Sequence, residues 1–393
     1  VMTTSWFPTA SARRTARGRT SSRSSSRNIN AKVMKRTIIL ILLTLTCGSC
    51  YVKHTGTPAG YEIIEYPVEN GIGTEYHPSE IILCDERTWV LSARNKDEFK
   101  TGLFVTYDSG KSWKKNSDSD RGEIYENLVF DRGILFCSSY HSSWNKTNTI
   151  MASYDLGTTW NELCSFVKEI EKFMVTNDNT FVQLYSSYHD EKAVKPDNRR
   201  SIIYSDDNCK NWKTAFKGEN FTSSFSKNIV LDVDKENDYR IISINPQTQK
   251  FDTIRTPCRS PMQVIAGEDI IGIWNDRRAD YFRIVKDTAV FLSRIKYDMI
   301  WTSHVPMEIY QHGDIVYSSV LVPSVESNIK MFVSTDHAKS WTQVDTKGPM
   351  DKEYDRVWTP VGEAWFMAGY DDFMVSYCVG EKDGQRQDFI KII

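Results

Sequence analysis

Residues 106–113 read Thr-Tyr-Asp-Ser-Gly-Lys-Ser-Trp, and the chain repeats this pattern three more times. The second copy, residues 153–160, keeps the template Ser/Thr-x-Asp-x-Gly-x-Ser/Thr-Trp in full. The third and fourth copies, residues 205–212 and 334–341, hold cysteine and alanine in place of the glycine. Such self-similarity indicates one structural unit that is used several times.

The residue types of the repeat suit a tight turn between two strands. The aspartate accepts hydrogen bonds from backbone N–H groups, and glycine adopts the positive φ angles that other residues resist. The tryptophan is large enough to fill the space between neighbouring sheets. Each copy follows a short strand pattern, such as Leu103 to Thr106. We therefore expect structural, not catalytic, roles for Asp108, Trp113, Asp155, Trp160, Asp207, Trp212, Asp336 and Trp341.

The repeat resembles the Asp-box (BNR) repeat of sialidase-like β-propellers, and the resemblance covers about residues 75–393. It implies an all-β fold, a β-propeller of four-stranded blades. It also implies that the boxes lie between the third and fourth strands at one face, while binding or catalysis uses the loops of the opposite face.

The spacing of the aspartates bears on the number of blades. They lie 47 residues apart (108 to 155), then 52 (155 to 207), then 129 (207 to 336). The long gap fits three blades, two of them without a box, so seven blades are favoured, with six as the alternative if the ends combine. We expect a closing strand at 61–66, since a propeller needs its ends tied together. The strands of the last blade are expected at 357–361, 364–369, 373–378 and 389–393.

The first 74 residues have the composition of an export signal and a linker. Residues 1–33 are rich in Arg and Ser and are expected to be disordered or an upstream extension of the reading frame. Residues 34–50 have a basic start, a short apolar run and a small-residue end, as in a signal peptide. Cys47-Gly-Ser-Cys50 resembles a bacterial lipoprotein box, which implies acylation of Cys50 and a place in the cell envelope; secretion as a soluble protein is the alternative. The linker with the closing strand is then 51–74, and the propeller 75–393.

Charge and cysteine spacing exclude some partners. The net charge of −2 provides no basic face for a nucleic acid. The cysteines after Cys50 are scattered without a CxxC pair, so neither a metal site nor another cofactor is expected. Export permits disulfides, but buried free thiols are typical of apolar strands, and the sequence leaves the pairing open. These cysteines are Cys84, Cys137, Cys164, Cys209, Cys258 and Cys378.

The face opposite the boxes provides the candidate site. Its loops between second and third strands are expected at 94–100, 140–146, 188–200, 275–280 and 370–372, and two of them share the sequence Ser-Ser-Tyr-His. Polar and aromatic loop tips suit a sugar or a peptide, although shared repeat ancestry explains them equally. The candidate ligand-binding residues are Arg94, Tyr140, His141, Tyr188, His189, Trp274, Arg277, Arg278, Arg356 and Trp358, and the candidate catalytic carboxylates are Asp276, Glu353 and Asp371.

Sialidase chemistry requires three arginines that clamp the substrate carboxylate, and the family places the first of them in an Arg-Ile-Pro segment before the first box. Here that stretch reads Pro78-Ser-Glu80-Ile-Ile-Leu83, without arginine. We therefore expect an exported, lipid-anchored and monomeric propeller that binds a glycan or an envelope or extracellular protein without sialidase catalysis. A glycoside hydrolase that uses two facing carboxylates is the alternative, and an envelope structural protein without a specific ligand is a third hypothesis.

Overall fold

The computed structural model describes residues 62–67, 72–73, 75–95, 97–120, 122–141, 148–176, 179–185, 200–218, 229–233, 239–244, 251–254, 263–275, 278–295, 305–322, 328–344, 353, 356–358, 367–371 and 373–393. All of them belong to one compact unit, Val52–Ile393. The expected upstream extension, the signal peptide and Cys50 lie outside the described residues. No helix in these ranges is long and apolar enough to cross a membrane.

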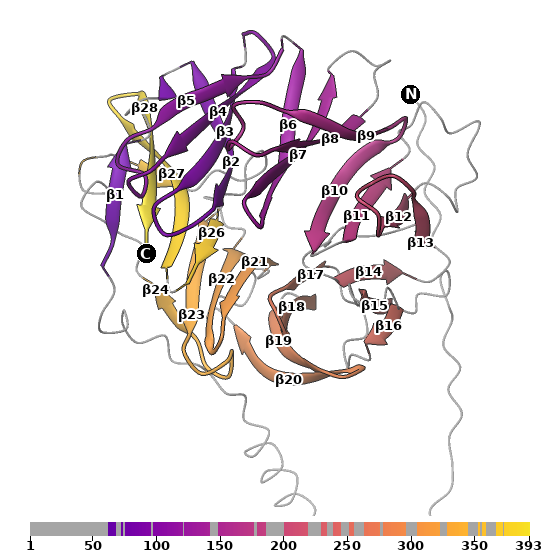
Figure 1. Cartoon of the computed structure of the whole chain (residues 1–393). Helices are drawn as coiled ribbons and strands as arrows, with labels where there is room; N and C mark the ends of the chain where they lie inside the picture. Colours follow the sequence, from indigo (N-terminus) through magenta and orange to yellow (C-terminus); the bar gives the residue numbers. More distant parts are fainter. Residues whose placement is uncertain are drawn as a thin grey trace, which may run out of the picture. The chain divides into compact units, whose positions relative to one another are not determined.

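The described strands are antiparallel and form seven sheets, here named A to G (Figure 1). Sheet B contains β2 (Tyr76–Leu83), β3 (Trp89–Asn95), β4 (Lys100–Thr106) and β5 (Lys114–Asp118). Sheet C contains β6 (Glu123–Asp131), β7 (Ile134–His141), β8 (Asn148–Ser153) and β9 (Asn161–Phe166). Sheet D contains β10 (Glu169–Thr176), β11 (Asn179–Tyr185), β12 (Arg200–Ser205) and β13 (Lys213–Gly218).

Sheet E contains β14 (Ile229–Val233), β15 (Tyr239–Ile244) and β16 (Phe251–Ile254). Sheet F contains β17 (Gln263–Ala266), β18 (Ile270–Asn275), β19 (Arg278–Val285) and β20 (Thr288–Ile295). Sheet G contains β21 (Val305–His312), β22 (Ile315–Val322), β23 (Asn328–Ser334) and β24 (Thr342–Val344). Sheet A contains β1 (Ile64–Pro67), β25 (Arg356–Trp358), β26 (Met367–Tyr370), β27 (Phe373–Lys382) and β28 (Gln385–Ile392).

Between most successive sheets, the first strands contact one another. We call these the inner strands: β2 contacts β6, β6 contacts β10, β14 contacts β17, β17 contacts β21, and β21 contacts β26, which contacts β2. Each following strand of a sheet pairs with the strand before it in the chain. The all-β expectation is confirmed, and this order of meandering sheets is that of a β-propeller.

Sheet A joins the two ends of the described chain. The N-terminal strand β1 pairs antiparallel with the C-terminal β28, with Glu65 opposite Lys391. Both side chains are almost fully buried, and Glu65 Oε1 lies 3.3 Å from Lys391 Nζ. The expected composition of the last blade was wrong, because β25 and β26 both pair with β27 along the same edge. β25 and β26 therefore occupy the same position in the order of strands, next to β27, and β1 supplies the outer strand beyond β28.

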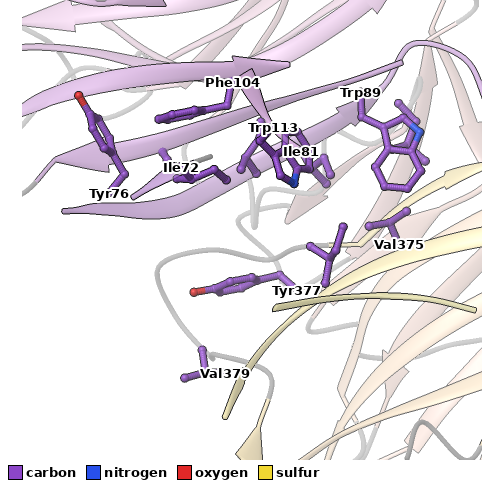
Figure 2. Close-up of a cluster of buried hydrophobic side chains, with 13 residues drawn as sticks. Ile72, Tyr76, Ile81, Trp89, Phe104, Trp113, Val375, Tyr377 and Val379 are labelled. Atoms are coloured by element: carbon purple, nitrogen blue, oxygen red, sulfur yellow. The ribbon is translucent and has the colours of Figure 1, made fainter. Parts of the chain in front are cut away.

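The core lies between neighbouring sheets. In Figure 2, Trp113 of sheet B packs in one cluster with Val375 and Tyr377 of β27 in sheet A. Trp341 is buried in the cluster between sheets F and G. Trp160 and Trp212 are half-buried against the B–C and C–D clusters. Each repeat tryptophan therefore contributes to the contact between its own sheet and the preceding one.

The four repeats form one turn geometry, which we call the Asp turn. In the first, Asp108 Oδ1 accepts a hydrogen bond from Ser112 N (2.9 Å) and Asp108 Oδ2 accepts one from Ser112 Oγ (2.6 Å). Thr106 Oγ1 accepts a hydrogen bond from Gly110 N (3.0 Å). The hydrogen bond from the Ser112 side chain, followed by that from Thr106, lowers the pKa of Asp108 to about 2. The same contacts recur around Asp155, Asp207 and Asp336.

Two successive residues of every Asp turn have positive φ. In the first turn they are Ser109 (59°) and Gly110 (85°). Cys209 (65°) and Ala338 (59°) adopt this conformation without being glycine. The turn geometry therefore persists where the glycine of the template is lost, because the side-chain hydrogen bonds still hold the backbone.

The glycine of the first turn is also required by its neighbours. A Cβ on Gly110 would lie 2.5 Å from Ile390 Cδ1 and 2.8 Å from the Trp89 ring. We expect Gly110→Ala to lower the free energy of unfolding by about 1–2 kcal/mol for the left-handed backbone and by about 1–3 kcal/mol more for overpacking. Gly133 has a similar φ (82°) with nothing within 4 Å, so Gly133→Ala should show only the smaller effect. Urea denaturation compares the two, and equal losses would contradict the steric argument.

The buried Glu65–Lys391 pair should stabilise the closing strand. Lys391→Met leaves the Glu65 carboxylate buried without its cation, and we expect a loss of about 3–5 kcal/mol. The double variant Glu65→Gln/Lys391→Met should lose less than the single variant, because no uncompensated charge remains. A double-mutant cycle by urea denaturation measures the coupling, and additive losses would show that the pair does not interact.

Candidate functional site

The strand register reveals one position shared by four inner strands. The first residues of the Asp turns, Thr106, Ser153, Ser205 and Ser334, pair with Trp89, Leu135, Thr180 and Val316 of the second strands. Three residues further along each second strand, the partner on the inner strand is a charged residue. These partners are Glu80 in sheet B, Glu126 in C, Lys172 in D and Glu308 in G.

An irregularity in the pairing adjoins each of these charged residues. The register shifts between Pro78 and Glu80, between Ile170 and Lys172, between Pro306 and Glu308, and directly after Glu126. Bulges redirect a side chain and are common beside functional sites. The repeated bulge therefore positions one charged side chain per sheet at the inner strands.

Three of the four side chains interact although their sheets are not successive in the chain. The charge of Lys172 in sheet D lowers the pKa of both Glu80 in sheet B and Glu308 in sheet G. The charge of Glu80 in turn raises the pKa of Glu308. Interactions of this kind weaken with distance, so the three side chains lie within electrostatic reach of one another at the inner strands, where Lys172 is exposed and both glutamates are half-buried.

Burial moves the pKa of both carboxyl groups into the neutral range. Desolvation raises the pKa of Glu80 to about 7, although Leu128 N donates a hydrogen bond to Glu80 Oε2 (2.9 Å). Desolvation, together with the charge of Glu80, raises the pKa of Glu308 to about 8. Each side chain keeps some solvent exposure. A protonated carboxyl group in such a place can donate a hydrogen bond to a ligand or act as a general acid.

Glu126 is the centre of a second group of polar side chains. Arg94 of β3 forms an ion pair with Glu126 of β6 across the B–C junction. Tyr140 of β7 donates a hydrogen bond to Glu126 Oε1 (3.4 Å). Beside them, Ser139 Oγ donates to Glu123 Oε1 (2.5 Å). The side chains of Arg94 and Glu126 are 38% and 35% exposed, and Tyr140 is half-buried. We call these three residues the B–C cluster.

The structure brings together only part of the predicted site. Arg94 and Tyr140 meet at Glu126, and His141 is half-buried at the end of β7. Trp274 and Arg278 are half-buried at the two ends of the β18–β19 connection. Glu353 is exposed in a turn, and for Arg356 and Trp358 only the backbone in β25 is described. Tyr188, His189, Asp276 and Arg277 lie outside the described residues.

The expected position of Asp371 was wrong. Asp371 lies in the turn between β26 and β27, the first and second strands of its sheet, and not between the second and third. Its Oδ1 lies 3.4 Å from His312 Nε2, at the end of β21. The following turn, through Asp314, contacts the Asp turn of sheet G at His337. Asp371 is therefore at the Asp-turn edge and does not face Arg94.

Sequence reasoning missed Glu80 and Glu308. Both stand in a Pro-x-Glu-Ile segment, residues 78–81 and 306–309, which is the signal that could have identified them. That signal becomes meaningful only when the strand register shows the two segments to be equivalent. In the ranges that the structure describes, no group of three or more His, Cys, Asp or Glu side chains could hold a metal ion.

The two raised pKa values predict a pH-dependent stability. Unfolded glutamates ionise near pH 4.5, whereas the folded chain holds these protons up to about pH 7 and 8. The folded state thus binds more protons between these limits, and its stability falls as pH rises from 5 to 8. We expect Glu80→Gln/Glu308→Gln to reduce this loss, as measured by urea midpoints at pH 5 and pH 8. Exposed Glu353→Gln serves as the control, and an unchanged pH dependence in the double variant would contradict the assignment.

No protein-family model matches the sequence, and no curated protein matches it either. Solved structures do match. A prolyl endopeptidase, from a study of two such enzymes, superposes with a TM-score of 0.51 at 12% identity, over 83% of this chain and 51% of that chain. The β-propeller domain of the Trilobed protease from Pyrococcus furiosus superposes with a TM-score of 0.52 at 9% identity, over 81% of this chain and 95% of that domain. This chain therefore spans about half the length of the prolyl endopeptidase, and at such low identities the likeness shows the fold alone, a β-propeller.

Proposed function

We propose that this chain is an exported β-propeller, anchored through an acylated Cys50, that binds a glycan at the B–C cluster without sialidase catalysis. The observation that carries the proposal is the meeting of Arg94, Glu126 and Tyr140 from two sheets. The cluster offers a guanidinium donor, a carboxylate acceptor and a phenol within one contact network. Sugar hydroxyl groups both donate and accept hydrogen bonds, and an aromatic ring supplies an apolar face.

The charges near the inner strands favour a neutral or amino sugar over a sialic acid. Glu80, Glu126 and Glu308 occupy the shared register position in sheets B, C and G, and among the four described sheets that have an Asp turn, sheet D has a cation there, Lys172. A sialidase clamps the carboxylate of its substrate with arginines. Carboxyl groups in this arrangement would repel such a substrate once they ionise.

The binding proposal is tested with the purified full chain on a glycan array, followed by titration calorimetry of a glycan that binds. Removal of a hydrogen bond that involves a charged group costs about 1.5–3 kcal/mol. We therefore expect Arg94→Ala to weaken binding roughly 10- to 100-fold, and Tyr140→Phe to weaken it less.

A matched control is the exposed Lys213–Asp206 ion pair of sheet D. Lys213→Ala removes a comparable surface cation beside an Asp turn and should leave the affinity unchanged. Full affinity in Arg94→Ala would refute the assigned site. Saturable binding of a protein, with no glycan bound, would instead identify the other class of partner.

A glycoside hydrolase is the second candidate function, and the convergence of Glu80 and Glu308 favours it. A pair of carboxyl groups, one protonated and one ionised, is the usual requirement for glycoside hydrolysis. If the purified chain hydrolyses a glycoside and either Glu80→Gln or Glu308→Gln abolishes the turnover, the chain is an enzyme. Turnover that survives both substitutions would exclude this pair.

A further inference from the structure

The outer strand of one sheet is tied to the Asp turn of the next. Ser117 of β5 donates a hydrogen bond to the carbonyl of Gly157 in the Asp turn of sheet C (2.5 Å). Ser293 of β20 likewise donates to the carbonyl of Ala338 in the Asp turn of sheet G. Gly157 and Ala338 both occupy the glycine position of the repeat. A serine on the outer strand and the glycine position of the next turn therefore form a recurring junction.

The register shows that Cys164 occupies the serine position of this junction. Ser117 pairs with Leu103 and Ser293 pairs with Tyr281, each directly before a shift in register. Cys164 of β9 pairs with Ile150 directly before the same shift. Because the three outer strands share this irregularity, Cys164 faces the next Asp turn as the two serines do.

Cys209 occupies the glycine position of that next turn, in sheet D. Its backbone N–H donates to Ser205 Oγ (3.0 Å), as Gly157 N donates to Ser153 Oγ. The thiols of Cys164 and Cys209 are joined by a hydrogen bond. Both positions of the junction between sheets C and D are thus cysteine, whereas neither is cysteine at the B–C and F–G junctions described above.

We propose that Cys164 and Cys209 are an oxidation site, where a disulfide joins the outer strand of sheet C to the Asp turn of sheet D. A disulfide requires the two sulfur atoms to meet, with Cβ atoms about 3.5–4.5 Å apart, and the hydrogen bond already brings the two thiols into contact. Cys164 is half-buried and meets the oxidant, whereas Cys209 is buried.

The reaction is a thiol–disulfide exchange with a low-molecular-weight or protein disulfide as the oxidant. The hydrogen bond to Cys209 and burial raise the pKa of Cys164, so Cys164 first loses its proton to a base in solution. It then attacks one sulfur of the oxidant, whose S–S bond breaks; a mixed disulfide forms and the first half of the oxidant leaves as a thiolate, which takes up a proton. The Cys209 thiolate then attacks Cys164 Sγ, forming the protein disulfide and releasing the second half of the oxidant. The two cysteines lose two electrons and two protons, and the oxidant gains them as two thiols.

The cross-link would enclose β10, β11 and β12, the first three strands of sheet D. It restricts the unfolded chain and therefore stabilises the folded one. It also fixes sheet D, which carries Lys172 on its inner strand, to sheet C.

The test uses the purified full chain, reduced with dithiothreitol and then equilibrated with oxidised glutathione. After alkylation and proteolysis, mass spectrometry should find the Cys164 and Cys209 peptides joined, and both cysteines protected from alkylation. Oxidation should raise the apparent Tm by about 2 °C or more, and dithiothreitol should reverse the rise. Alkylation of both cysteines after oxidation, or joining of either one to another cysteine, would overturn the proposal.

The repeats supply a control that should fold. Cys164→Ser/Cys209→Gly recreates the Ser117–Gly157 junction found between sheets B and C, and it should abolish the glutathione-dependent rise in Tm. Cys137→Ser removes a buried thiol elsewhere in sheet C and should leave the rise intact. A rise that persists in the first variant would show that oxidation acts at other cysteines.

Discussion

The hydrogen bonds of the Asp turn are the constraint on which the rest of the fold depends. Two successive residues with positive φ are unfavourable for ordinary side chains, yet all four turns contain them. The aspartate and the Ser/Thr before it bind the backbone N–H groups of the turn and so compensate for the strain. Cys209 and Ala338 show that these bonds hold the turn even without glycine. The geometry of each Asp turn also directs the tryptophan that follows it toward the preceding sheet.

The placement of the inner strands follows from the packing of these tryptophans between neighbouring sheets. Because each tryptophan contributes to the cluster between its sheet and the preceding one, those sheets pack face to face in chain order. In each of these sheets the third strand pairs with the second, and the second with the inner strand, at the same offset from the Asp turn. Equivalent positions on the inner strands are therefore occupied by Glu80, Glu126, Lys172 and Glu308. A structural repeat at one edge thereby sets the geometry of a polar group at the inner strands.

The sequence was sufficient for the features that are local. The Asp turns and the all-β class could be predicted from short patterns, since these depend on neighbours in the chain. The strand near residues 61–66 was expected for a different reason, because a propeller ties its ends together, and its partner β28 lies at the other end of the chain. The last blade was assigned incorrectly because two short segments, β25 and β26, share one partner strand, which no alternation pattern reveals. Asp371 was misplaced for the same reason, since the count of strands before it was wrong. Glu80 and Glu308 were missed because their meeting joins sheets far apart in the sequence.

The convergence of Glu80, Lys172 and Glu308 limits what the inner strands can bind. Two carboxylates and one ammonium would carry a net negative charge, and burial of the two glutamates raises their pKa values to about 7 and 8, which favours the protonated carboxyl groups. A neutral ligand that accepts hydrogen bonds suits the protonated state, whereas a cationic ligand favours ionisation and would release protons on binding. Within this group of three, an anionic ligand gains only from Lys172 and is opposed by each carboxyl group that ionises. The charge balance at the inner strands therefore disfavours an acidic sugar for the same physical reason that the missing arginine does.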